Sequence, residues 1–251
     1  MWFWFVSLIA SGSLVGTLCA QGFDWIPTYL RPFRIPQLYG VVGITAGYVR
    51  VDDPDVLSDG TLVCARYGSG GGTSIGANVG GEWWILPDVS VNGLVGIGWI
   101  QSNHSAPGTI APLVTGEQLR TEYVLSTSRL GFSVQAAAKK RLAWRYSWAS
   151  LGLDATIYTQ RRIVQTERVI EPTWYFFSTT PPSKQVQFAS TSSDRIDVLL
   201  SLTVAMGYDV PLTIGWYSSP SLYATVPLTL KPGDYRLWRI GITIPVAFSF
   251  R

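Results

Sequence analysis

The end of the chain alternates strictly between large apolar residues and small, polar or charged ones. From Trp238 to Phe250 the even positions are Trp, Ile, Ile, Ile, Val, Phe and Phe, with Arg, Gly, Thr, Pro, Ala and Ser between them. Alternation with a period of two is typical of a β-strand that has one apolar face. The run exceeds the roughly 5–6 residues of an ordinary strand and reaches the roughly 9–11 residues that a tilted strand needs to cross a bilayer. It therefore predicts a wall strand of a membrane barrel, with lipid outside and a polar lumen inside.

Further segments alternate in the same way, and together with the last they make eight. They cover residues 38–51, 72–85, 89–102, 120–137, 143–160, 195–209 and 212–228. The connections alternate in length: 52–71, 103–119 and 161–194 are long, whereas 86–88, 138–142 and 209–211 are short. The connection 229–234 breaks this pattern, because it is short although it lies at the end of the barrel that has the long connections. Short periplasmic turns and longer extracellular loops are typical of outer-membrane barrels, so the pattern predicts an all-β, closed antiparallel eight-stranded up-and-down transmembrane β-barrel.

The composition supports a membrane location. Hydrophobic residues make up 47% of the chain and charged residues 14%, against about 25% charged residues in typical soluble proteins. No internal run of 18 apolar residues exists, so closure into a barrel is the way left to satisfy backbone groups in lipid. The net charge of +3 is small and the basic residues are scattered, which indicates no nucleic-acid partner. We expect the bacterial outer membrane as the location.

The chain divides into three predicted parts. Residues 1–20 are interpreted as a secretory signal peptide, 21–36 as a periplasmic N-terminal lead-in, and 37–251 as the outer-membrane β-barrel. A lipoprotein anchored at Cys19 is the alternative to signal cleavage. After cleavage Cys64 is the single cysteine, so no internal disulfide and no cysteine metal site is expected. We predict no cofactor and no metal.

Aromatic residues gather at the ends of the predicted strands. Trp83, Trp216, Phe248 and Phe250 are predicted to mark one membrane interface, and Tyr48, Trp99 and Trp238 the other. The alternative is that these are core aromatics of a soluble sandwich. Pro220 and Pro245 fall inside predicted strands, which requires either a bulge there or different strand ends.

The predicted inward face carries charges. They are Glu82, Arg129, Asp154, Asp197 and Arg239. The lumen of an eight-stranded barrel is just wide enough to be filled by side chains, and buried charges must be paired. The sequence therefore predicts a salt-bridged lumen charge network that plugs the barrel, with Arg239 near Asp154 or Asp197. An ion gate or relay built from the same residues is the alternative.

Evidence for catalysis is sparse. The chain has one histidine, His104, followed by Ser105 in a predicted flexible loop, and no G-x-S-x-G motif. We predict no catalytic residue and a non-enzymatic barrel, structural or part of an envelope assembly. Two alternatives remain open: an acyl-chain enzyme that modifies lipid A, and a soluble lipocalin-like barrel that binds an apolar ligand.

Three loop regions complete the pattern. Lys139–Arg141 is interpreted as a solvated periplasmic turn, with contact to anionic lipid or a periplasmic partner as the alternative. Gly68–Gly72 is interpreted as a flexible loop end, since no lysine or helix follows as in a phosphate-binding loop. The loop 161–194 carries the aromatics of 174–177, which favour contact with other envelope proteins or a fold over the barrel mouth.

Two motifs resemble the small outer-membrane β-barrel superfamily. They are Gly80-Gly81-Glu82-Trp83-Trp84-Ile85 with Pro87 and the strand 89–99, and Met206-Gly207-Tyr208-Asp209-Val210-Pro211-Leu212, together with the alternating C-terminal end. Within the superfamily the chain resembles the PorT-like and OmpA-like eight-stranded barrels over residues 37–251. The resemblance implies outer-membrane lipid and the barrel-insertion machinery as partners, and it brings no functional residues. Such barrels usually end on an aromatic, whereas here Phe250 is penultimate and Arg251 is last.

Overall fold

The computed structural model describes residues 37–52, 67–142, 146–193, 196–213, 215–228 and 236–249. The predicted signal peptide and lead-in, Cys64, the connection 229–234 and Phe250 lie outside these residues. The described residues form eleven β-strands. None of them forms a helix long and apolar enough to cross a membrane.

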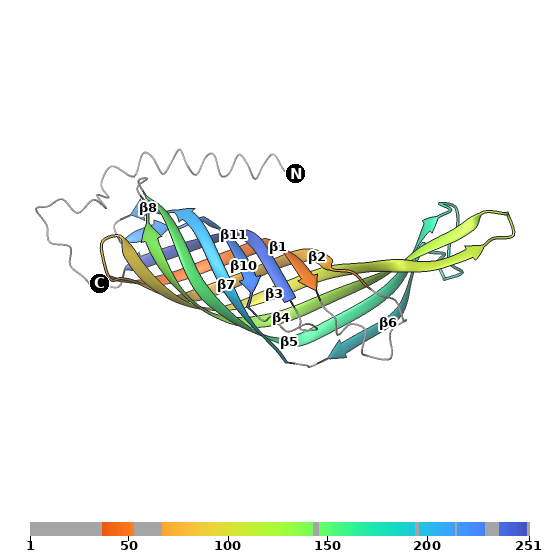
Figure 1. Ribbon diagram of the computed structural model, residues 1–251, viewed down its shortest axis with the longest axis horizontal. Helices are drawn as coiled ribbons and strands as arrows, with labels where there is room; N and C mark the ends of the chain where they lie inside the picture. The colour runs from red at the N-terminus through yellow and green to blue at the C-terminus, as the bar shows by residue number, and fades with distance from the viewer. Residues whose placement is uncertain are drawn as a thin grey trace, which may run out of the picture.

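The strands close into a barrel (Figure 1). They are β1 (Gln37–Asp52), β2 (Gly70–Trp84), β3 (Val89–Pro112), β4 (Gln118–Arg141), β5 (Ser147–Glu171), β6 (Gln185–Ser193), β7 (Asp197–Tyr208), β8 (Val210–Thr213), β9 (Trp216–Ser218), β10 (Ser221–Pro227) and β11 (Arg236–Ser249). The order β1-β2-β3-β4-β5-β7-β10-β11 is closed by antiparallel pairing of β11 with β1, in which Ile44 lies opposite Ile244. This ring confirms the predicted closed, antiparallel, eight-stranded barrel.

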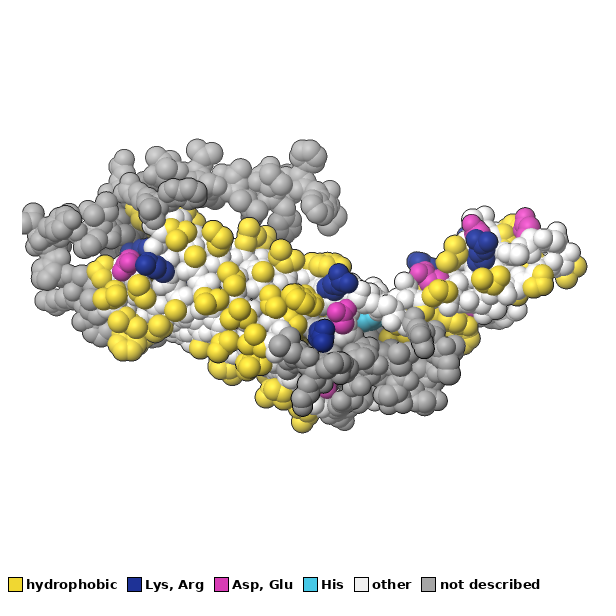
Figure 2. Space-filling view, in the orientation of Figure 1, with side chains coloured by type: hydrophobic (Ala, Val, Ile, Leu, Met, Phe, Trp, Pro, Cys, Tyr) yellow, Lys and Arg dark blue, Asp and Glu magenta, His cyan; other side chains and the backbone are white. Residues whose placement is uncertain are grey.

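Side chains alternate between the two faces of the wall. Ile44 and Ile75 are each 62% exposed and Ile242 is 50% exposed, whereas Val49 and Leu237 on the same strands are fully buried in the lumen. Apolar side chains cover the barrel wall seen in Figure 2. The interior also holds buried polar residues such as Ser201 and Thr203. Large apolar residues outside and a largely polar interior are the arrangement that lipid requires and the reverse of a soluble barrel.

Three wall strands continue well beyond the barrel. The predicted loops 103–119 and 161–194 are wrong in large part, because β3 and β4 stay paired up to Pro112 and Gln118, and β5 continues to Glu171 and pairs with β6. We call residues 103–112, 118–126, 161–171 and 185–193 the extension; it projects from the barrel at the right of Figure 1. Above the membrane no lipid enforces alternation, so the sequence pattern fades there although the hydrogen-bond ladder continues.

The seventh predicted segment is broken and its turn is displaced. The predicted turn at 209–211 is wrong. A further strand, β8, begins directly after Asp209 and pairs with β9, and the chain turns near Gly215, whose φ is +78°. Pro220 lies between β9 and β10, which explains this interruption because proline gives the ladder no donor. Pro245 stays within β11, opposite Gly43, and its carbonyl accepts a 2.9 Å hydrogen bond from the Ser219 amide.

Candidate functional site in the barrel lumen

A buried lysine organises the lumen at the short-turn end. The Lys139 ammonium donates to Asp209 Oδ1 at 2.7 Å and to Ser219 Oγ at 3.2 Å, and it lies 3.3 Å from Glu82 Oε1. The side chains of Lys139 and Asp209 are 3% and 1% exposed. We call Glu82, Lys139, Asp209 and Ser219, with their aromatic neighbours Trp84, Trp148 and Tyr217, the inner closure.

Aromatic rings surround this cation. Lys139 Nζ lies 4.7 Å from the ring centroid of Trp148 and 5.3 Å from those of Trp84 and Tyr217. The Tyr217 hydroxyl and the Ser90 hydroxyl both donate to the Glu82 carboxylate, the latter at 2.5 Å. Paired charges, hydrogen bonds and cation–π contacts together offset the large cost of burying charge. The inner closure therefore places a buried cluster of paired charges in the lumen.

The interpretation of Lys139–Arg141 as a solvated turn is wrong for Lys139. β4 runs to Arg141, so Lys139 points into the lumen while Lys140 is exposed outside. Asp209 lies between β7 and β8, and Ser219 lies between β9 and β10. These two strand interruptions lie side by side, and Ser219 Oγ donates a 2.6 Å hydrogen bond to Asp209 Oδ1. Sequence reasoning missed this site because the ligands of Lys139 are 70 and 80 residues away along the chain. One signal in the sequence was available: Lys139 has an odd residue number, as do Arg129 and the other inward-facing residues of its strand.

A polar chamber follows above the inner closure. Asp154 Oδ1 accepts from Arg239 Nη2 at 3.1 Å and from Thr156 Oγ1 at 2.6 Å. These residues line a cavity of about 150 Å³ that reaches from Tyr217 in the inner closure to Tyr158.

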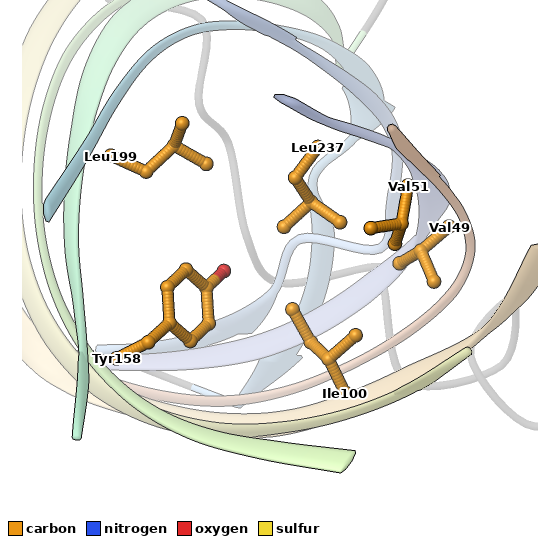
Figure 3. Packing of buried hydrophobic residues seen from close by; sticks show 6 residues of the cluster. All are labelled: Val49, Val51, Ile100, Tyr158, Leu199 and Leu237. Atoms are coloured by element: carbon orange, nitrogen blue, oxygen red, sulfur yellow. The ribbon is translucent and has the colours of Figure 1, made fainter. Parts of the chain in front are cut away.

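An apolar layer, whose side chains Figure 3 shows pointing into the barrel, lies on the extension side of the chamber. It is formed by buried side chains that point into the lumen from five strands: Val49, Val51, Ile100, Tyr158, Leu199 and Leu237. The Arg129–Asp197 ion pair, with a 2.6 Å Nη1–Oδ2 distance, lies at the same level, since Arg129 is opposite Ile100 and Asp197 is opposite Tyr158. Buried side chains thus point into the lumen both above and below the chamber.

The five residues predicted as a lumen charge network occupy three separate levels. Arg239 lies beside Asp154, and Arg129 beside Asp197. Glu82 has as its cationic neighbour Lys139, which is not one of the five predicted residues.

His104 does not lie in a flexible loop. It belongs to β3 with its side chain buried, and its Nδ1 is 3.0 Å from the Gly68 carbonyl oxygen. Its Nε2 lies 3.4 Å from the hydroxyl of Ser102, and Ser102 is 2.7 Å from Thr127 Oγ1. Ser102 and His104 are 1% and 2% exposed, so both side chains are almost fully buried.

The predicted girdle residues that the structure describes lie on the outer wall. Trp83, Trp216 and Phe248 lie near the short-turn end, where the rings of Trp216 and Phe248 are 5.3 Å apart. Tyr48, Trp99 and Trp238 are exposed on the wall toward the extension. Among the described residues, no group of His, Cys, Asp and Glu is arranged to hold a metal ion.

The closed ring, the apolar outer wall and the polar side chains buried inside it define an outer-membrane β-barrel protein. The protein therefore resides in the bacterial outer membrane. No protein-family model matches the chain. No curated protein matches it either.

Several solved barrels are similar in structure. Neisserial surface protein A (NspA) has 12% identity and a TM-score of 0.36, covering 84% of this chain and 97% of that one. Ail, the attachment invasion locus protein of Yersinia pestis, has 13% identity and a TM-score of 0.34, covering 85% and 99%. An outer-membrane channel from Pseudomonas putida F1 has 10% identity and a TM-score of 0.28, covering 91% and 100%. At these values the similarity identifies neither a family nor an activity.

Proposed function

We propose that this protein is a non-enzymatic, non-conducting outer-membrane barrel that serves as a structural element and as a component of an envelope assembly. The observation that supports the proposal is that buried side chains point into the lumen at both ends, those of the inner closure at one and those of the apolar layer at the other. In the inner closure the charges are paired, and in the apolar layer the side chains are 0–4% exposed. A diffusion pore needs a continuous aqueous channel, as in barrels of 16–18 strands.

Reconstitution of the full chain into planar bilayers tests this proposal. We expect a conductance no higher than that of protein-free membranes, at neutral pH and moderate voltage. Large steady conductance from correctly folded protein would overturn the plugged barrel and favour the ion gate.

The acyl-chain enzyme is supported less well. Ser102 and His104 are close enough to interact, but both face inward and are buried, whereas lipid A acyl chains lie against the outer wall. Replacing His104 with Gln is expected to leave the acylation pattern of lipid A unchanged, measured by mass spectrometry of lipid A from cells with and without the protein. A change in acylation that depends on His104 would establish the enzyme instead.

We infer that the far end of the extension contacts other envelope proteins. Trp174 and Phe176 are 51% and 49% exposed in the connection between β5 and β6. Trp174 Nε1 donates to Glu117 at 2.9 Å, beside the β3–β4 turn, so this connection lies along the extension. This position favours the contact with other envelope proteins over the alternative of a fold over the barrel mouth. Exposed aromatic side chains of this density favour a binding surface.

A detergent pull-down tests the contact surface. Envelope proteins that co-purify with the parent protein should be lost from the W174S/F176S variant. The matched control is Leu86→Ser, a similarly exposed apolar residue at the opposite, short-turn end. Equal recovery with all three proteins would argue against this surface.

A further inference from the structure

The polar chamber contains buried polar atoms that have no hydrogen-bond partner in the part of the chain that the structure describes. Asn78 Oδ1, Ser221 Oγ and Arg239 Nε belong to residues that line the chamber, and none of these atoms has a hydrogen-bond partner among the described residues. Buried polar atoms are nearly always hydrogen-bonded to protein or to water. The cavity of about 150 Å³ has room for several water molecules, since each takes about 30 Å³ in the liquid.

The chamber is bounded by two barriers of different chemistry. Below it, Lys139, Tyr217 and Glu82 of the inner closure contribute to its lining. Above it, Tyr158 and Ile100 of the apolar layer do the same. An ion would have to break a paired charge cluster at one end and pass the buried apolar layer, which has the Arg129–Asp197 ion pair at the same level, at the other. Apolar constrictions hinder the passage of ions.

We propose that the lumen is an interrupted ion path: a water-filled chamber between two barriers in series, each of which is sufficient alone to stop ions. This inference rests on the proposed non-conducting function and goes further, because it states where water is and how many barriers there are. Barriers in series obey a simple rule: conduction appears only when both are removed.

Conductance of reconstituted variants tests the rule. The apolar layer is weakened by L199A/L237A, and the inner closure by K139A/D209A, which removes one cation and one anion together. We expect each double variant to conduct no more than the parent protein and the quadruple variant to conduct about tenfold more or higher. Equal conductance of one double variant and the quadruple variant would overturn the proposal in favour of a single barrier. A quadruple variant that is folded, shown by its heat-dependent gel mobility, but silent would overturn the continuous water path.

A labelling experiment does not depend on the quadruple variant. Ser221→Cys places a thiol in the chamber, in a background where Cys19 and Cys64 are serine. A small cationic methanethiosulfonate reagent should label this cysteine in the L199A/L237A variant and leave it unlabelled when the apolar layer is intact. Labelling with the layer intact, or no labelling once it is weakened, would overturn the sealed chamber. Large conductance of the parent protein is a different result, since it would remove the proposed function itself.

Discussion

Lys139 offers the sharpest test of how the lumen is stabilised. In Lys139→Met the side chain keeps its length but loses its charge, so Asp209 and Glu82 lose the cation that lies 2.7 and 3.3 Å away. Arg141, whose Nε lies 3.9 Å from Asp209 Oδ2, remains nearby but at a longer distance. Removing one partner of a buried ion pair costs about 3–5 kcal/mol, because an uncompensated charge stays behind. We expect the free energy of unfolding to fall by this amount.

The measurement is urea unfolding in phospholipid vesicles, followed by tryptophan fluorescence, to which Trp84 and Trp148 beside Lys139 contribute. The control is Lys140→Met, which removes the next charge along the same strand from an exposed position and should change stability by no more than about 0.5 kcal/mol. A second variant, K139M/D209N, should recover about 1–3 kcal/mol of the loss because one orphaned anion is neutralised. The reasoning is refuted if Lys139→Met and Lys140→Met are equally stable, or if adding Asp209→Asn brings no recovery.

Three other predictions concern the wall and the apolar layer. Arg129→Met should destabilise the barrel by less than Lys139→Met, about 1–3 kcal/mol in the same assay, because its partner Asp197 is 18% exposed and retains some hydration; an equal or larger loss would contradict this ranking. Leu237→Ala should cost about 2–5 kcal/mol by opening a cavity in a fully buried position, and a loss below about 1 kcal/mol would show that the layer collapses around it. Ile242→Arg should cost about 2–4 kcal/mol if this residue faces lipid, whereas Ile110→Arg on the extension, also exposed, should cost little, so equal effects would contradict the assignment of lipid-facing residues.

Alternation alone was enough to predict the wall. Lipid and lumen impose opposite demands on successive residues, so Ile44, Ile75 and Ile242 could be assigned to the outside without any structure. The same constraint explains where prediction failed. In the extension both faces of the sheet lie outside the lipid, and residues such as Asn103 and Pro107 resemble a loop although they pair with β4.

The charge pairs could be predicted only in part. The alternation of each strand identified charged side chains that point into the lumen. Arg239 and Asp154 lie at a similar distance from the short-turn end, which correctly predicted that they pair. Lys139 escaped because three successive basic residues resemble a turn, and because its ligands come from two strands interrupted at Asp209 and Ser219. Such an interruption depends on the backbone geometry at Pro220 and on strand pairing across the barrel. Neither can be predicted from the residues next to it in the sequence.

The unbroken length of β3 has a mechanical consequence. Residues 103–112 continue past the barrel in the same 24-residue strand, and at about 3.3 Å per residue they raise the β3–β4 turn by roughly 30 Å. β3, β4 and β5 each run as one strand from the barrel into the extension, where an irregularity between Pro107 and Ile110 shifts the pairing of β3 with β4. A partner bound at the end of the extension is therefore held away from the bilayer, and a force applied there is transmitted along β3 to the barrel wall.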